Sequence, residues 1–196
     1  LQSGEGRSRS DIGLPGVQQE LLEEVYKVNK NIVLVLTNGR PLAIPWAAQN
    51  IPAIVEAWQL GTQSGNAIAE VLYGDYNPSG KLPVTFPRSV GQLPLYYNHM
   101  STGRPSTNDP ESVFWTHYID EKTSPQFPFG YGLSYSKFEY SNLKLSSNSF
   151  TSNGEIKVSI QIKNTSTVKG KEVVQLYIRD LFGSIVRPVK ELKEFK

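Results

Sequence analysis

The sequence predicts an α/β chain in two parts. The first is part of an open α/β sandwich with a mostly parallel sheet and flanking helices, and the second is an incomplete antiparallel β-sandwich. Three observations indicate this order. A continuous apolar run at residues 31–37 is typical of a strand buried on both faces of a parallel sheet, helical apolar spacing occurs on either side of it, and residues 136–196 alternate apolar with polar side chains.

The open α/β part begins with an amphipathic helix within residues 13–29. Pro15 suits its first turn, and its apolar residues at helical spacing are Val17, Leu21, Leu22, Val25 and Val28. Because the glutamates of this segment face the other way, we expect the apolar face to dock on an apolar surface.

Two strands and a second helix follow. The apolar runs 31–37 and 51–58 predict strands, and Pro41 excludes a helix directly after the first of them. Residues 61–76 open with small side chains and continue as a helix that ends near Gly74. Because so few strands leave open edges and an uncovered face, we expect them to be the second half of a larger sheet, in a chain truncated at its start.

The composition then shifts toward turn and loop residues. Residues 81–86 predict a short edge strand interrupted by Pro83. Residues 88–128 are rich in Pro, Tyr, Asn, Ser and Thr and have neither helical nor strand periodicity. Such a long irregular stretch in a compact protein is usually functional or lies across a surface, so a lid and a belt are both open.

Antiparallel strands are predicted beyond residue 135. Four segments with apolar side chains at every second position are separated by turn residues: 138–146, 155–166, 170–180 and 189–195. Because a sandwich of this kind has about seven strands, we expect the module to be unfinished at the end of the chain.

Composition excludes several classes of function. The formal charge is +2, from 20 basic and 18 acidic residues, and no dense basic cluster marks a nucleic-acid surface. No apolar run approaches the roughly 20 residues that span a bilayer. There is no cysteine, and neither His99 nor His117 has a second ligand at metal spacing. We therefore expect no nucleic acid, no membrane span, no metal and no cofactor.

Several separate motifs resemble one family, and they occur in that family's order. They are SGEGRSRSDIGLPG (3–16), NGRPLAI (38–44), YNPSGKLPVTFP (76–87), FPFGYGLSY (127–135) and KNTSTVKGKEVVQLYIRD (163–180). Together they closely resemble the C-terminal region of glycoside hydrolase family 3, in particular its bacterial periplasmic β-glucosidases. The resemblance covers essentially the whole chain.

The resemblance implies an enzyme of three parts. Residues 1–135 would be the C-terminal part of the family's α/β sandwich domain, including the belt at 88–128. Residues 136–196 would be the N-terminal part of a fibronectin type III-like domain. The N-terminal barrel, which carries an aspartate nucleophile, lies outside the chain, so we expect these 196 residues alone to be inactive.

By the same resemblance, Glu5 is the general acid and then the general base of a retaining hydrolysis. That reaction needs a nucleophilic carboxylate and a protonated carboxyl about 5–5.5 Å apart. A loop with glycine on both sides of Glu5 lets the side chain reach a sugar bound in another domain. Because a nearby cation would favour the charged form of Glu5, we expect Arg7 and Arg9 to point elsewhere, for example to Asp11 or to the barrel.

Other candidates for substrate binding are Ser8, Arg9 and Trp115. Ser8 and Arg9 have hydrogen-bonding groups for sugar hydroxyls, although contacts that stabilise the loop would use the same groups. Trp115 lies in the irregular FWTHY segment, where its ring has either a structural role or one of stacking on a sugar.

The leading function is thus a fragment of a retaining β-glucosidase that hydrolyses terminal non-reducing β-D-glucosyl residues. The alternatives are a β-xylosidase or another exo-β-glycosidase of the same family, and a non-catalytic scaffold or binding fragment. The expected partners are an oligosaccharide or an aryl or alkyl β-glucoside, and the N-terminal barrel; a homodimer is compatible with the sequence. The resemblance implies a periplasmic or secreted protein.

Overall fold

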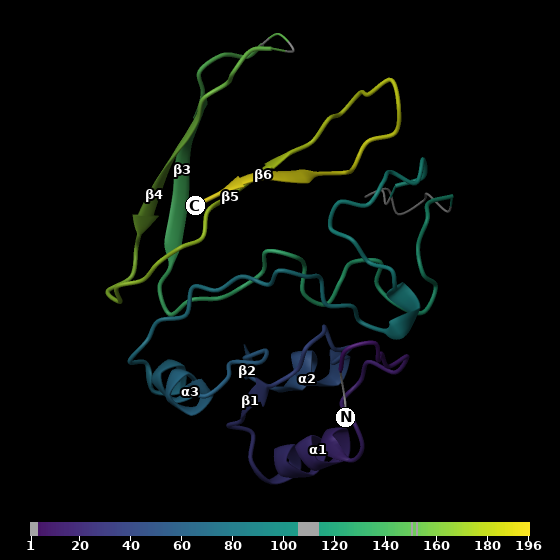
Figure 1. Cartoon of the computed structure of the whole chain (residues 1–196), viewed down its shortest axis with the longest axis vertical. Coiled ribbons are helices and arrows are strands. Elements are labelled where there is room, and N and C mark those ends of the chain that lie inside the picture. The colour runs from purple at the N-terminus through teal and green to yellow at the C-terminus, as the bar shows by residue number, and fades with distance from the viewer. Residues whose placement is uncertain (1–3, 106–113, 150, 152) are drawn as a thin grey trace.

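The computed structural model describes residues 4–105, 114–149, 151 and 153–196. Figure 1 shows the α-helices and the parallel strands at one end of the molecule and the antiparallel strands at the other end, with mostly irregular segments between them. This arrangement confirms the predicted order of an α/β part followed by an antiparallel β module.

The α/β part is built around two parallel strands. Its elements are α1 (Gln18–Val28), β1 (Val33–Leu36), α2 (Pro45–Asn50), β2 (Ala53–Glu56) and α3 (Ser64–Tyr73). The strands pair from Val33 with Ala53 to Leu36 with Glu56. The buried core between them and the helices consists of Leu22, Leu36, Ile44, Ala47 and Ile51. Both strands are shorter than the apolar runs that predict them, because the ends of those runs enter the flanking turns.

Helix α2 corrects the prediction of two strands without a helix between them. Pro41 does exclude a helix immediately after β1, but Pro45 occupies the first turn of α2. Proline is tolerated there because the N–H it lacks has no partner inside the helix. Ala47 is fully buried, so this short helix connects the parallel strands and fills the core between them.

The apolar face of α1 is only partly covered. Leu22 is buried, whereas Val17 is 72% exposed, Leu21 is 62% exposed and Val28 is 87% exposed. The helix begins at Gln18, later than Pro15 suggests, because Gly16 with φ 58° keeps the preceding residues out of helical conformation. Within the described residues, α1 therefore docks on the core through Leu22 and through Tyr26, whose ring meets that of Trp46 edge-on at 5.5 Å.

The predicted edge strand at residues 81–86 is wrong. These residues pair with residues 127–131 through Leu82 N to Tyr131 O (2.7 Å), Gly130 N to Leu82 O (2.8 Å) and Phe86 N to Phe127 O (2.8 Å). Pro83 has no N–H to donate, so a regular ladder does not form. The two segments cross the middle of the molecule side by side (Figure 1).

The irregular stretch is held near both of its ends. Arg88 Nε donates to Ser124 O (2.9 Å), and the buried Gln92 donates through Nε2 to Lys122 O (2.8 Å). Its only helix among the described residues is the 3-10 turn Val90–Gln92, and residues 106–113 lie outside the described part. These bonds join the two ends of the stretch to each other, an arrangement compatible with a lid and with a belt.

The β module contains two antiparallel pairs, as the alternation predicts. β3 (Phe138–Leu145) pairs with β4 (Val158–Asn164), and β5 (Gln175–Ile178) pairs with β6 (Glu191–Phe195).

The side-chain amide of Asn77 makes the first group of contacts between the α/β part and the β module. Its Nδ2 donates to Ser136 Oγ (2.8 Å) and to Lys169 O (3.0 Å). Its Oδ1 accepts from Ser134 Oγ (2.9 Å) and from Tyr135 N (2.8 Å). All four hydrogen bonds that an asparagine side chain can form are made, and they join the segment after α3 to the residues that lead into β3 and to Lys169, between β4 and β5.

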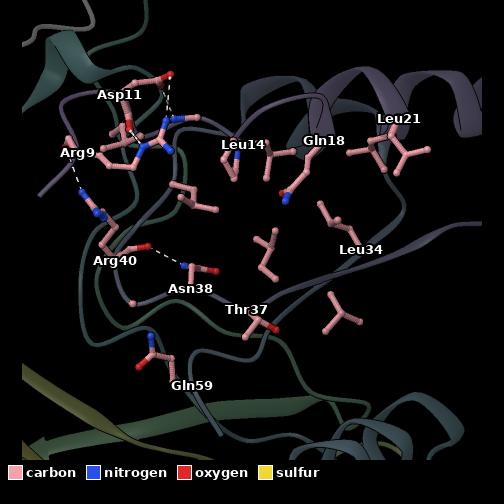
Figure 2. A pocket seen from close by; sticks show the side chains of 18 of the residues that line it. Arg9, Asp11, Leu14, Gln18, Leu21, Leu34, Thr37, Asn38, Arg40 and Gln59 are labelled. Carbon is pink, nitrogen blue, oxygen red and sulfur yellow. Dashed lines mark hydrogen bonds and ion pairs between the residues drawn. The ribbon is translucent and has the colours of Figure 1, made fainter. Parts of the chain in front are cut away.

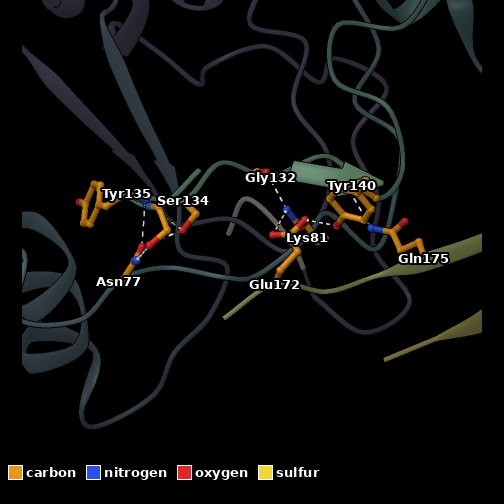
Figure 3. Close-up of polar contacts among 10 residues, drawn as sticks. Asn77, Lys81, Gly132, Ser134, Tyr135, Tyr140, Glu172 and Gln175 are labelled. Atoms are coloured by element: carbon orange, nitrogen blue, oxygen red, sulfur yellow. Dashed lines mark hydrogen bonds and ion pairs between the residues drawn. The ribbon is translucent and has the colours of Figure 1, made fainter. Parts of the chain in front are cut away.

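An ion pair forms the second half of this junction (Figure 3). Lys81 Nζ lies 3.3 Å from Glu172 Oε2 and donates to Gly132 O at 2.9 Å. Glu172 Oε1 accepts from the Tyr140 hydroxyl at 2.8 Å. The charged side chains are only 14% and 15% exposed. Burial and the bond to Glu172 raise the pKa of Tyr140 to about 12, so Tyr140 remains a neutral donor at ordinary pH.

We predict that Glu172→Gln destabilises the protein, because it leaves a largely buried Lys81 without its counter-charge. The expected loss is about 2 kcal/mol of unfolding free energy, or a Tm lower by roughly 4–8 °C, measured by thermal unfolding. The matched control is Glu191→Gln, since Glu191 pairs with Lys193 at the same 3.3 Å but with side chains 47% and 46% exposed. Equal shifts for the two variants would contradict a stabilising junction.

Candidate active site

Glu5 lies at the tip of a tight turn. Arg7 N donates to Gly4 O at 3.1 Å, and Gly6 has φ 66°. A positive φ at the third residue of a four-residue turn is the arrangement of a type II turn, which favours glycine at that position. The side chain of Glu5 is exposed, so the turn presents a carboxyl group outward from the α/β part.

Arg9 lies against Asp11, as predicted. Its Nε donates to Asp11 O at 3.3 Å, and its Nη2 lies 3.9 Å from Asp11 Oδ2. Asp11 also accepts a bond from Gly13 N at 2.9 Å through its other carboxylate oxygen. These contacts close the loop on itself directly after the turn.

The loop is fastened to the segment that follows β1. Arg40 Nη1 donates to Arg9 O at 3.1 Å and to Ser8 Oγ at 3.4 Å. Farther along, Ala43 N donates to Ile12 O at 2.9 Å, and Ile12 is buried. Figure 2 shows the Arg40 guanidinium directed at the loop.

Polar side chains also meet at the carboxyl ends of β1 and β2. Asn38 Nδ2 donates to Arg40 O at 2.6 Å and to Glu56 Oε2 at 3.2 Å, and Trp58 N donates to Glu56 Oε1 at 2.9 Å. Burial raises the pKa of Glu56, and the bonds from Trp58 and Asn38 partly oppose that rise. Asn38 Oδ1 is buried without a hydrogen-bond partner among the described residues and points away from Arg40 (Figure 2).

A cavity of about 660 Å³ lies behind the loop. One wall consists of apolar side chains of α1 and β1, including Leu21, Leu22 and Leu34, and the other contains Asn38 and Arg40. Figure 2 shows the loop of Arg9 and Asp11 at the rim of this cavity. The loop thus lies at the rim of a partly apolar cavity, and both its hydrogen bonds and the buried Ile12 hold it there.

The structure brings three of the predicted site residues together. Glu5, Ser8 and Arg9 share one loop, and Ser8 and Arg9 are engaged in contacts that stabilise it. Trp115 lies in the belt, where its ring stacks on His117 with centroids 4.0 Å apart. Among the described residues, no hydrogen bond or ring contact joins Trp115 to the Glu5 loop.

Sequence reasoning did not identify Asn38, Arg40 and Glu56 as site residues. A signal was available, because polar residues at the carboxyl ends of parallel strands meet at one edge of the sheet. Asn38 and Arg40 lie in the turn that follows β1, and Glu56 is the last residue of β2.

A family model described as the glycosyl hydrolase family 3 C-terminal domain matches residues 1–135. The chain belongs to glycosyl hydrolase family 3. A second model, described as a fibronectin type III-like domain, matches residues 172–196. Both parts of the fold class expected from the sequence are therefore supported.

Several family 3 relatives match nearly the whole chain. It is 47% identical over 192 residues to a periplasmic β-glucosidase of Salmonella typhimurium, covering 98% of this chain and 25% of the relative. It is 45% identical over 197 residues to a β-xylosidase of Formosa agariphila, covering 98% and 26%. A crystal structure of a β-glucosidase from Listeria innocua in complex with isofagomine matches with a TM-score of 0.95 at 43% identity, covering 100% of this chain and 27% of that one. The chain thus spans about a quarter of the length of these family 3 relatives.

The described residues also bear on two further properties, membrane spanning and metal binding. No helix there is long and apolar enough to cross a membrane. No group of three or more His, Cys, Asp or Glu side chains there is arranged to hold a metal ion.

We predict that Glu56→Gln becomes progressively more favourable for stability as the pH rises. A raised pKa means that the folded chain favours the protonated carboxyl, so the contribution of Glu56 is full below its unfolded pKa and is lost as the pH rises through its folded pKa. Glutamine stays neutral throughout. The unfolding free energy of the variant relative to the wild type should therefore increase as the pH rises above about 4. A difference that is constant with pH in urea unfolding would contradict this reading of the site.

Proposed function

We propose that this chain supplies the acid/base residue of a retaining β-glucosidase. The complete enzyme would hydrolyse terminal non-reducing β-D-glucosyl residues by double displacement. Glu5 would give a proton to the leaving oxygen and then take one from water. The observation that carries the proposal is an exposed carboxyl at the tip of a hydrogen-bonded turn, in a loop fastened at the carboxyl end of β1.

The geometry suits a residue that acts on a sugar held by another domain. Retaining hydrolysis needs a second carboxyl about 5–5.5 Å from the first, on the opposite side of the scissile bond. The chain spans only about a quarter of the length of its relatives. We infer that the nucleophile is an aspartate of an N-terminal barrel that lies outside the chain. A side chain that projects outward from a turn is suited to reach into such a neighbouring domain.

The charges around the loop are compatible with a proton donor. A guanidinium against Glu5 would favour the carboxylate and oppose proton donation. Arg9 instead contacts the carbonyl and carboxylate oxygens of Asp11.

Further residues have subsidiary roles in this proposal. Arg9 has a side chain 36% exposed, and with Ser8 it would hydrogen-bond sugar hydroxyls at the rim of the loop. Trp115, backed by His117, would offer an aromatic face to the leaving-group side of the substrate. Residues 1–135 would form the α/β sandwich part with the belt, and residues 136–196 the start of the fibronectin type III-like domain.

A β-xylosidase is the second candidate, because a relative with that name is 45% identical over 98% of this chain. Sugar preference would be set mostly by the barrel, so another exo-β-glycosidase specificity is equally compatible with the loop. A scaffold role would instead leave Glu5 without effect on catalysis. The substrate would be an oligosaccharide or an aryl or alkyl β-glucoside, and the periplasmic relative favours a periplasmic or secreted enzyme.

The proposal predicts that Glu5→Gln in the complete parent enzyme acts selectively on poor leaving groups. An unactivated disaccharide needs a proton at its leaving oxygen, so its kcat/KM should fall by about 10²–10⁴. Formation of the glycosyl-enzyme from an aryl glucoside with a good leaving group should change far less, which pre-steady-state release of the phenol would measure.

The matched control is Glu20→Gln, which neutralises an exposed glutamate in the first turn of α1. It should leave both rates unchanged. Equal, small effects of Glu5→Gln on the two substrates would mean that the proton donor lies elsewhere.

A further inference from the structure

We propose that Arg40 is a positioning residue for Glu5: it holds the loop so that the turn carrying the proton donor has one fixed position. The inference rests on the function proposed for Glu5 and extends it to a residue with no part in the chemistry itself. Arg40 would act through the loop backbone, with no contact to the substrate.

The first support is the reach of the guanidinium. Arg40 lies 31 residues after Arg9 in the chain, yet its Nη1 donates to the Arg9 carbonyl at 3.1 Å and to Ser8 Oγ at 3.4 Å. Ser8 follows directly on Arg7, the last residue of the turn that contains Glu5. The contact therefore fixes the loop immediately beside the turn.

The second support is that Arg40 is itself held. Its carbonyl oxygen accepts a 2.6 Å bond from Asn38 Nδ2, and Asn38 also donates to Glu56 at the end of β2. Pro41 follows Arg40 and restricts its backbone to extended conformations. Hydrogen bonds thus connect the ends of β1 and β2, through Asn38 and Arg40, to the loop. The paired strands support a loop that has no regular secondary structure of its own.

The chemistry of arginine suits this role better than that of lysine. The acceptors are a carbonyl and a hydroxyl, both neutral, so the contact works through directed hydrogen bonds more than through charge. A planar guanidinium presents several donors in a fixed geometry, whereas a lysine ammonium is a single mobile point charge. The side chains of α1 and β1 that line the cavity beside the loop include Leu21, Leu22 and Leu34, which have no hydrogen-bonding groups to hold the loop in the way that Arg40 does.

A displaced loop would have a selective kinetic consequence. Proton transfer depends on a heavy-atom separation within hydrogen-bond reach, so a shift of about 1 Å can cost about a hundredfold in rate. Attack by the nucleophile does not involve the loop. Loss of Arg40 should therefore damage the acid-dependent reaction and spare the reaction of a substrate with a good leaving group.

The test uses the complete parent enzyme with four variants: Arg40→Ala, Arg40→Lys, Glu5→Gln, and the double variant of Arg40→Ala with Glu5→Gln. For Arg40→Ala, kcat/KM on an unactivated disaccharide should fall by about 10- to 100-fold. Glycosyl-enzyme formation from the activated aryl glucoside should change by less than about threefold. Arg40→Lys should fall between Arg40→Ala and the wild type, because an ammonium can replace one of the two bonds.

The double variant separates positioning from an independent effect. If Arg40 acts only through Glu5, its removal costs nothing once Glu5 can no longer donate a proton, so the double variant should match Glu5→Gln on the disaccharide. Multiplicative losses would overturn the proposal. The matched control is Arg187→Ala, an exposed arginine 4.0 Å from Asp180 in the β5–β6 loop, which should retain full activity.

The other possible results separate a positioning role of Arg40 from a structural one, and failure of this inference from failure of the proposed function. Equal losses on both substrates for Arg40→Ala, accompanied by a lower Tm, would assign Arg40 a purely structural role and overturn the inference. If that variant does not fold, Arg40→Lys carries the same comparison. If Glu5→Gln shows the leaving-group dependence and neither Arg40 variant does, only the positioning role fails. If Glu5→Gln shows no such dependence, the proposed function fails, and the inference fails with it.

Discussion

The hydrogen bonds that join residues 8–12 to the segment after β1 are the constraint on which the candidate site depends. Glu5 stands on an exposed turn, and no helix or strand contains it. Its position is therefore set by Arg40 on Ser8 and Arg9, and by the backbone bond between Ala43 and Ile12. A loop supported in this way can be exposed to a substrate and still have a definite geometry.

The same paired strands connect the site to the rest of the chain. β1 and β2 end beside one another, so Asn38 can bond to Glu56 across them and to the backbone of Arg40. On the other side of the molecule, Asn77, Lys81 and Glu172 join the α/β part to the β module through satisfied polar contacts. Buried polar groups that are all paired favour one arrangement of two parts over many.

Much of the architecture follows from local sequence patterns, and the site follows from them only in part. Alternation predicts β3 to β6, and the small-residue start and Gly74 predict α3. Helix α2 was missed because six residues are too few for a helical period to be recognised. The supposed edge strand at 81–86 failed because Pro83 prevents a ladder. The pairing of Arg40 with Ser8 and Arg9 could not be predicted, because they lie more than 30 residues apart in sequence and only the fold brings them together.

The central claim is that Glu5 exchanges protons with the substrate and with water. The most direct test is product analysis of Glu5→Ala in the complete parent enzyme, with an activated aryl β-glucoside and added sodium azide. Azide needs no general base, so it should accelerate turnover and give the β-configured glucosyl azide, because the second displacement restores the original configuration. Glucose as the sole product, at a rate independent of azide, would contradict the assignment of Glu5 as the acid/base residue.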